Sequence, residues 1–344
     1  MTLLNEADQA RYVVDRVLQS REMGLRLMDQ AVLFRTSSHS GQLEVELTRR
    51  NVPFVKFGGL KFLDAAHVKD LLALLRFAQN SRDKVAGFRV LQLVSGVGPV
   101  AAGRVLDAVA AVPDAMAALQ AVPAPPRSGP EWAGLVAALA GAAGPDWPAG
   151  IARLRDWYDP QMTRLHEDAE ARRGDLLQLE QIAAGYPSRE RFLTDLTLDP
   201  PDATGGQAGV PLKDEDYLIL STIHSAKGQE WKAVHVLNVV DGCIPSDMAT
   251  GTQDEIEEER RLLYVAMTRA KDSLTLNVPL KFFVTQQTRH GDRHIYGIRS
   301  RFISPAMLDR FEVTHWAPPV QASMVGPARQ PIDVSARMRD MWQS

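Results

Sequence analysis

Two kinds of apolar pattern alternate along the first part of the chain. Some stretches carry apolar side chains at helical spacing, and others are short continuous apolar runs of strand length. In order, the pattern predicts a helix, a strand, a helix and a strand over residues 6–23, 31–34, 42–50 and 54–57. A further helix follows, with Asp64 as its N-cap and an apolar stripe over residues 68–75. This rhythm indicates a parallel sheet with helices on its faces.

The same rhythm returns near the C-terminus. Strands are predicted over residues 217–222, 234–240 and 274–278, and a helix over residues 257–271. The first of these runs ends in a turn of small and basic residues, at the strand end where ligands bind in open α/β sheets. Acidic residues crowd the first turn of the predicted helix and basic residues lie near its end, as the helix dipole favours.

Between these regions the chain is rich in alanine and shows no strand pattern. The stretch Leu93–Arg104 resembles a helix-hairpin-helix element, in which the backbone N–H groups of Gly96 and Gly98 would face a phosphate with Arg104 nearby. A tight turn between two packed helices explains the same glycines. We expect a discontinuous α/β domain of residues 1–80 and 207–312, an inserted helical domain of residues 81–206, and an extended tail over residues 313–344.

Composition narrows the function classes. The 344 residues have a formal net charge of −3, so contact with nucleic acid would need a local basic patch. The single cysteine, Cys243, excludes an intrachain disulfide and a cysteine-based zinc site. The apolar run 133–143 is too short to span a bilayer, and the first residues lack a secretory core. We therefore expect a cytoplasmic protein with no membrane partner.

Three stretches resemble motifs of a known family. Thr222–Trp231 (TIHSAKGQEW) and Glu257–Leu274 (EEERRLLYVAMTRAKDSL) are similar to motifs V and VI of the UvrD/Rep/PcrA-like superfamily 1 DNA helicases, and Ala31–Ser38 (AVLFRTSS) to motif IV. The resemblance implies the C-terminal half of such an enzyme. Its fold would be a RecA-like parallel sheet, the 2A domain, interrupted by an all-helical 2B domain. Its activity would be ATP-dependent 3′→5′ DNA unwinding or translocation.

The resemblance also implies roles in ATP binding and hydrolysis. Arg35 and Arg269 would reach the γ-phosphate as catalytic residues, because a guanidinium meets two phosphate oxygens at once. Phe34 would stack on the adenine, Glu230 would bond the ribose, and Gly228 would supply backbone freedom after the turn. The alternatives are a loop salt bridge for Arg35, a helix-end cation for Arg269, a buried strand residue for Phe34 and a surface charge for Glu230.

DNA contacts follow from the same motifs. Thr222, His224 and Lys227 would bind single-stranded DNA through its phosphates, and the Gly96–Gly98 turn with Arg104 would touch duplex DNA. Lys227 could equally serve an intradomain ion pair. We expect the acidic run 254–259 to start a helix rather than hold a divalent metal ion.

The sequence contains no Gly-Lys-Ser/Thr, so it lacks the phosphate-binding loop of the family. Asp214–Glu215 precedes a predicted strand, whereas a magnesium-binding acid should end one. ATP with its Mg²⁺ would therefore be held jointly with an N-terminal 1A/1B half, and we expect this chain alone to be inactive. The alternative is a non-catalytic DNA-binding or regulatory module that kept the fold. A helicase–nuclease subunit is disfavoured because the tail is too short for a nuclease domain.

Overall fold

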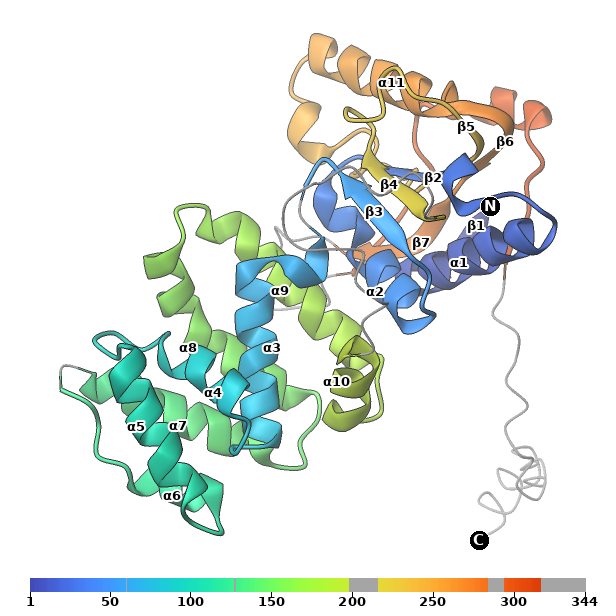
Figure 1. Ribbon diagram of the computed structural model, residues 1–344. Coiled ribbons are helices and arrows are strands. Elements are labelled where there is room, and N and C mark those ends of the chain that lie inside the picture. The colour runs from blue at the N-terminus through green and yellow to red at the C-terminus, as the bar shows by residue number, and fades with distance from the viewer. Residues whose placement is uncertain (60, 127, 198–215, 284–293, 317–344) are drawn as a thin grey trace, which may run out of the picture.

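The computed structural model describes residues 1–59, 61–126, 128–197, 216–283 and 294–316. Figure 1 shows two lobes. The α/β lobe contains residues 1–57, 216–283 and 294–316, and the helical lobe contains residues 62–126 and 128–197. In the chain, the helices of the helical lobe stand between β3 (Phe54–Phe57) and β4 (Leu218–Thr222) of the α/β lobe.

A five-stranded sheet forms the centre of the α/β lobe. Its order is β3-β4-β2-β5-β6, and each neighbouring pair is parallel. The strands are β2 (Gln30–Phe34), β3 (Phe54–Phe57), β4 (Leu218–Thr222), β5 (Trp231–Val236) and β6 (Ala270–Leu276). All five residues of β2 and of β4 are buried, which explains why these strands read as continuous apolar runs and not as alternating ones.

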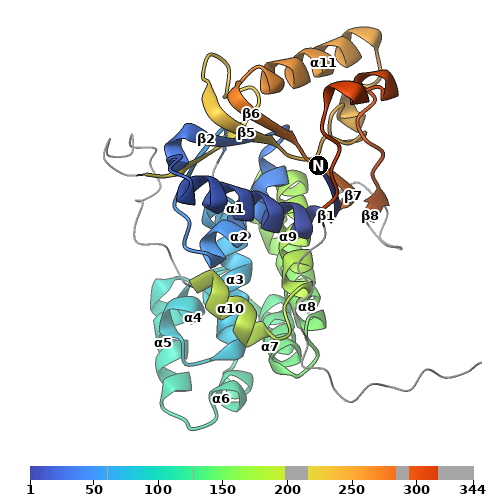
Figure 2. The ribbon, with the colours of Figure 1, turned by 90° about the vertical axis from the view of Figure 1, so that its right-hand side faces the viewer.

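Helices cover both faces of this sheet. On one face, α1 (Glu6–Glu22) and α2 (Gly41–Arg49) share a core with Val32 and Phe34 of β2. On the other, α11 (Gln253–Met267) shares a core with Ala31 and Leu33. Figure 2 shows α11 and α1 on opposite sides of the strands. The lobe therefore has the RecA-like architecture of a parallel sheet between helical layers.

A second, smaller sheet was not predicted. It has the order β1-β7-β8, with β1 (Thr2–Asn5) parallel to β7 (Val278–Phe283) and β7 antiparallel to β8 (His294–Tyr296). Residues 314–316 continue it, since Thr2 N–H donates to Thr314 O at 2.8 Å and Trp316 N–H donates to Thr2 O at 3.0 Å. The first residues of the predicted tail are therefore ordered against β1, while residues 317–344 lie outside the described part.

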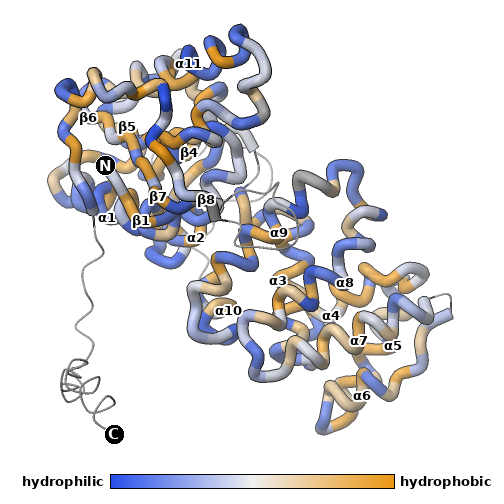
Figure 3. Tube along the Cα trace, turned by 180° about the vertical axis from the view of Figure 1, so that it is seen from behind, coloured by the Kyte–Doolittle hydropathy of each residue, from blue (hydrophilic) through white to orange (hydrophobic). Residues whose placement is uncertain are grey.

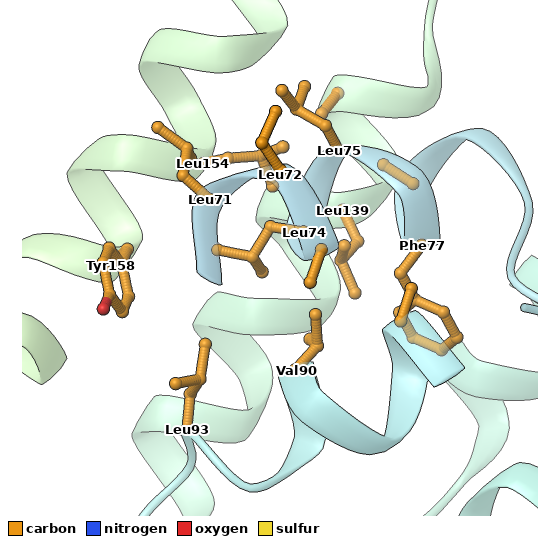
Figure 4. Close-up of a cluster of buried hydrophobic side chains, with 14 of the residues drawn as sticks. Leu71, Leu72, Leu74, Leu75, Phe77, Val90, Leu93, Leu139, Leu154 and Tyr158 are labelled. Carbon is orange, nitrogen blue, oxygen red and sulfur yellow. The ribbon is translucent and has the colours of Figure 1, made fainter. Parts of the chain in front are cut away.

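The helical lobe is built from eight described helices around one apolar core. They are α3 (Ala66–Gln79), α4 (Lys84–Leu91), α5 (Pro99–Ala110), α6 (Ala115–Ala121), α7 (Gly129–Ala143), α8 (Ala149–Leu165), α9 (Ala169–Ala184) and α10 (Arg189–Thr197). Figure 4 shows the leucines of α3 packed against residues of α4, α7 and α8. This core includes Val45 of α2 and then residues from Phe62 onward, so it starts before the expected domain boundary at residue 80.

The described part of the chain shows where the sequence pattern misplaced element ends. Asp64 closes a short 3₁₀ helix, Phe62–Asp64, and α3 has Ala65 at its N-cap, so the predicted cap was wrong. The helix around the motif VI resemblance starts four residues earlier than predicted, because Thr252 and Glu255 form a capping box, and it also ends four residues earlier, at Met267. Figure 3 shows apolar residues along the central strands and through the helical lobe. None of the described helices has the length and apolar character of a membrane span.

Candidate nucleotide and DNA site

The predicted site residues of the α/β lobe fall at two opposite ends of the five-stranded sheet. Arg35 and Thr222 lie at the carboxyl ends of β2 and β4, whereas Glu230 and Arg269 directly precede β5 and β6. All five strands run the same way, and the 6 residues of β5 span about 20 Å at about 3.3 Å per residue. The structure therefore does not bring the two predicted catalytic arginines together.

At the carboxyl end, Arg35 is engaged by a buried carboxylate. Its Nε and one terminal nitrogen donate to Glu259 Oε1 at 2.9 and 2.6 Å, and Glu259 Oε2 also accepts the backbone N–H of Ser246 at 3.1 Å. The side chain of Glu259 is only 3% exposed and that of Arg35 is 20% exposed. Arg35 thus forms a salt bridge, the alternative that sequence analysis had left open, with a partner on α11.

Phe34 is not placed to stack on a nucleotide. Its side chain is fully buried in the core between the sheet and helices α1 and α2. The ammonium of Lys56 lies over the ring, 5.7 Å from its centroid, and is itself held by Glu44 at 2.8 Å. Phe34 is thus the buried strand residue that sequence analysis left open as the alternative, since a ring enclosed on the core side of a parallel strand offers no free face.

Hydroxyl groups surround two glycines at the same end. Thr222 Oγ1 donates to Ser225 Oγ at 3.0 Å, and Gly58 and Gly59 have φ angles of 84° and 145°. A Cβ on Gly58 would overlap Thr222 Oγ1, and one on Gly59 would lie 2.6 Å from Ser37 Oγ. We call Ser37, Gly58, Gly59, Thr222 and Ser225 the hydroxyl cradle. Sequence analysis singled out Thr222 alone, although the Gly-Gly pair after a strand was visible as a signal.

An exposed turn leaves the hydroxyl cradle and leads to the other end of the sheet. His224 and Lys227 are exposed on it, and no carboxylate among the described residues pairs with Lys227. Gly228 has a φ of 84° and nothing within 4 Å of an added Cβ. Its predicted role in the backbone is thus observed, since a left-handed residue is needed where the turn closes.

At the amino end, Arg269 is held by neutral oxygens only. Its guanidinium donates to the carbonyl oxygens of Val265 and Gln229 and to Thr268 Oγ1, each at 3.0 Å. No carboxylate in the described part of the chain pairs with it. Helix α11 ends at Met267, and Arg269 lies two residues further on, in the turn before β6. Because its Nε donates to the carbonyl oxygen of Val265 in the last turn of α11, Arg269 also has the position of the helix-end cation considered above.

Glu230 lies beside Arg269 in this arrangement. The N–H of Trp231 donates to the carbonyl oxygen of Arg269 at 2.9 Å, which fixes the two turns against each other. The Glu230 carboxylate is 3.8 Å from the Lys271 ammonium, and both side chains are 53% exposed. A surface pair with that geometry is weak and easily exchanged for a ligand.

The stretch that resembles a helix-hairpin-helix element joins α4 to α5 in the helical lobe. Gly96 has a φ of 79°, and Gly98 is the N-cap of α5 in an extended conformation with open space around it. The turn before them is tied to α7, because Glu131 accepts the N–H and hydroxyl of Ser95 at 2.7 and 2.9 Å. The backbone bond from Ser95 chiefly holds the pKa of Glu131 below its usual value. Arg104 is exposed on α5.

Two buried histidines near these sites are uncharged near neutral pH. Burial, with a smaller contribution from the Arg35 charge, lowers the pKa of His39 to about 4, and burial likewise lowers that of His235 to about 4. Neither adds positive charge to a phosphate site near neutral pH.

Within the described residues, no group of histidine, cysteine, aspartate and glutamate side chains could hold a metal ion. Arg260 and Arg261 pair with Glu257 and Glu258, each three residues earlier on α11.

Sequence comparisons place these residues in a family context. The UvrD-like helicase C-terminal domain matches residues 2–110 and 191–280, which is more than half of the chain. DNA helicase II of Escherichia coli strain K12 is 28% identical over 330 residues, covering 87% of this chain and 43% of that helicase. ATP-dependent DNA helicase PcrA of Staphylococcus epidermidis is 28% identical over 294 residues, covering 79% of this chain and 39% of PcrA. The chain thus spans about two fifths of the length of these relatives.

Proposed function

The chain belongs to the UvrD-like helicase C-terminal domain family, and we propose that it forms the C-terminal half of an ATP-dependent DNA helicase or translocase of 3′→5′ polarity. The ATP site is completed by an N-terminal RecA-like half that supplies the phosphate-binding loop and the magnesium ligands. ATP binding closes the cleft between the halves, and repeated closing and opening moves the protein along one DNA strand.

The observation that carries this proposal is the environment of Arg269. A guanidinium that is held by three neutral oxygens keeps its whole charge available to an anion. It is also oriented in advance, so little side-chain entropy is lost when a phosphate arrives. Arg269 therefore acts as the arginine finger, which stabilises the charge that develops on the transferring phosphoryl group.

Glu230 and Gly228 complete the chain's own contribution to nucleotide binding. The exposed Glu230 carboxylate accepts hydrogen bonds from the ribose hydroxyls after it releases Lys271. Gly228 lets the turn close without a side chain near the ligand. The adenine is bound by other groups, since Phe34 is enclosed in the core.

Arg35 has a conditional role in this proposal. Its two strongest donors are occupied by Glu259, so it binds a phosphate only after that ion pair opens. Opening is costly unless another cation replaces Arg35, because the 3%-exposed Glu259 would be left buried and unpaired. Arg35 and Glu259 thus connect β2 to α11 in the resting state and respond to the approach of the N-terminal half.

The hydroxyl cradle and the turn after it bind single-stranded DNA. Ser37 and Ser225 offer hydroxyl donors, and Thr222 holds Ser225 in place through the hydrogen bond between their hydroxyls. The two glycines of the cradle leave the room that these hydroxyl groups occupy. His224 and Lys227 lie exposed beside them and add donors to phosphates. None of these groups reads a base edge, so binding does not depend on sequence.

The helical lobe binds duplex DNA through its hairpin. Free N–H groups at the start of α5, the open position of Gly98 and the exposed Arg104 offer donors to one phosphate. Because Ser95 already donates to Glu131, this turn keeps its shape without DNA.

The reconstitution experiment tests the function. The 344-residue chain alone should hydrolyse no ATP above background, with or without single-stranded DNA, because it has no Gly-Lys-Ser/Thr loop. Joining it to an N-terminal half with that loop should restore DNA-stimulated hydrolysis, and Arg269→Ala in the joined protein should abolish it. DNA-stimulated turnover by the chain alone would contradict the proposal.

A second candidate is a non-catalytic DNA-binding module. The enclosure of Phe34 and the Arg35–Glu259 bridge favour it, since two predicted nucleotide contacts are unavailable in this structure. A module of this kind would bind single-stranded DNA through the hydroxyl cradle, and joining an N-terminal half would produce no hydrolysis. The same reconstitution therefore separates the two functions.

A further inference from the structure

A groove of about 770 Å³ lies beside β6, the last strand of the five-stranded sheet. One wall is polar and comes from α1, with Tyr12, Arg16 and Gln19. The other wall comes from residues 299–316, where Ile303, Leu308 and Phe311 form an apolar part. The floor between them is β6 itself over residues 273–276.

The outer edge of β6 is open within the described residues. Asn277 N–H donates to Val236 O on β5, and successive residues of a strand direct their backbone groups to opposite sides. Leu274 and Leu276 therefore direct theirs away from β5 and into the groove. Met1 N donates to Leu276 O at 2.9 Å from this outer side. Among the described strands of its sheet, β6 pairs with β5 alone. Open backbone groups of this kind are a template for another strand.

The register of β1 leads into this edge. Thr2 pairs with Val278 in a parallel ladder, and Val278 N–H donates to Met1 O at 2.9 Å. Continued backward, the same register places a residue directly before Met1 beside Leu276 and the third residue before it beside Leu274. Figure 2 shows the N-terminus at this position, close to β1 and β6. The groove is the space along which β1 would extend.

We propose that this groove binds an extended polypeptide strand that runs parallel to β6 in line with β1. The identity of this strand rests on the proposed function: in the helicase it is the polypeptide of the N-terminal half that leads into β1. The two halves are then joined by a continuous ladder of backbone hydrogen bonds as well as by the ATP site. The groove volume also suits a small molecule, but a small molecule would leave the strand edge unpaired.

The walls predict which side chains the strand carries. Paired residues of a sheet share a face, so residues beside Leu274 and Leu276 meet the wall that holds Leu308 and Phe311 and are apolar. The residue beside Thr275 meets Tyr12, Arg16 and Gln19 and is polar, since Tyr12 packs on His235, the β5 partner of Thr275. The expected pattern is apolar, polar, apolar.

The test adds a six-residue extension with this alternation before Met1. A first control carries the same extension with one serine inserted next to Met1, which turns every side chain to the opposite face. A second control is a glycine–serine extension of equal length. Burial lowers the pKa of the Met1 ammonium, and all three extensions replace that ammonium with a peptide N–H, so its loss is common to them. Hydrogen–deuterium exchange at the Leu274 and Leu276 amides is measured in each protein.

The alternating extension should slow exchange at both amides by about tenfold or more relative to the glycine–serine control. The shifted extension should protect them much less, and the melting temperature should rank the three proteins in the same order. Equal exchange in all three proteins would overturn the proposal. No step of this test involves ATP or DNA, so its failure is separate from a failure of the proposed helicase function.

Discussion

The two ends of the five-stranded sheet carry the same kinds of residue in opposite states. At the carboxyl end, Arg35 is neutralised by Glu259, and the glycines are packed against hydroxyl groups. At the amino end of β5 and β6, Arg269 meets neutral oxygens only, and Gly228 has open space around it. At one end the arginine is paired with a buried carboxylate, and at the other it has only neutral partners among the described residues.

This difference shows how the surroundings of an arginine determine its use. A guanidinium paired with a buried carboxylate mainly holds two elements together, because breaking the pair leaves a charge in the core. A guanidinium fixed by carbonyl oxygens keeps its charge for an incoming anion. Motif resemblance assigns both arginines to one phosphate, whereas their contacts separate them into a structural and a catalytic candidate.

The largest expected effect is at Arg269. In a complete helicase that contains this chain, Arg269→Ala should leave ATP binding nearly unchanged and lower hydrolysis by roughly 10³–10⁵, since a finger acts mainly in the transition state. This corresponds to about 4–7 kcal/mol. Arg269→Lys should recover little, because a point charge does not reproduce the planar fork. Steady-state hydrolysis and nucleotide-binding titrations measure the two quantities.

Arg261→Ala is the matched control for Arg269. Arg261 also lies on the α11 segment, but its side chain is 72% exposed and pairs with Glu258, so its loss should change turnover little. If Arg269→Ala retained more than about a tenth of the wild-type hydrolysis rate, on the scale expected for an arginine finger, Arg269 would not be that finger. The difference between the two sheet ends would then have no bearing on catalysis.

The next effect is on stability at the carboxyl end. Glu259→Ala removes the buried partner of Arg35 and should lower the free energy of unfolding by about 3–5 kcal/mol. Glu258→Ala on the same helix breaks the exposed pair with Arg261 and should cost about 0–1 kcal/mol. Urea denaturation of both variants gives the two values. Equal losses would mean that the Arg35–Glu259 bridge is no stronger than a surface pair.

The glycines at the two ends give a smaller and more local comparison. Gly228→Ala should cost about 1–2 kcal/mol, from its positive φ alone. Gly58→Ala carries the same backbone cost and in addition crowds Thr222 and Ser225, which should add about 1–3 kcal/mol. Thermal unfolding measures both. If the Gly58→Ala protein were as stable as the Gly228→Ala protein, the side chains of the hydroxyl cradle would be able to move aside for the added methyl group at no cost in stability.

The smallest expected effect lies in the helical lobe, where the hairpin can be compared with the hydroxyl cradle. Gly98→Glu should weaken binding of duplex DNA several-fold and leave binding of single-stranded DNA nearly intact, because the new carboxylate repels a duplex phosphate. The wild-type contact should weaken with added salt, as counterion release requires. Fluorescence anisotropy with both DNA forms measures the affinities.

Gly103→Glu provides the control for that hairpin. It adds the same charge to α5 at a position that also has open space around it, away from the Gly96–Gly98 turn. If both glutamate variants lost duplex affinity equally, the effect would be one of net charge, and the turn would have only its structural role.

Local patterns identified most of the elements. The strand Phe54–Phe57 was predicted to the residue, and α1, α2 and β2 to within one or two residues, because their apolar spacing suits one type of element only. The small sheet was missed, since β1 pairs with β7 across more than 270 residues and β1 is only 4 residues long. A short strand whose partner is remote has no local signature.

The candidate site likewise has features that the sequence predicts and features that only the tertiary structure shows. The residue types and their order in Thr222–Trp231 and Glu257–Leu274 are properties of the sequence alone, and they were sufficient to identify the family, the parallel sheet and the exposed turn around Gly228. Which face of β2 would enclose Phe34, and which carboxylate would neutralise Arg35, depended on α2 and α11. Burial and ion pairing are set by residues far away in the chain. Tertiary structure therefore decided which of the two arginines is paired with a buried carboxylate and which donates to neutral oxygens.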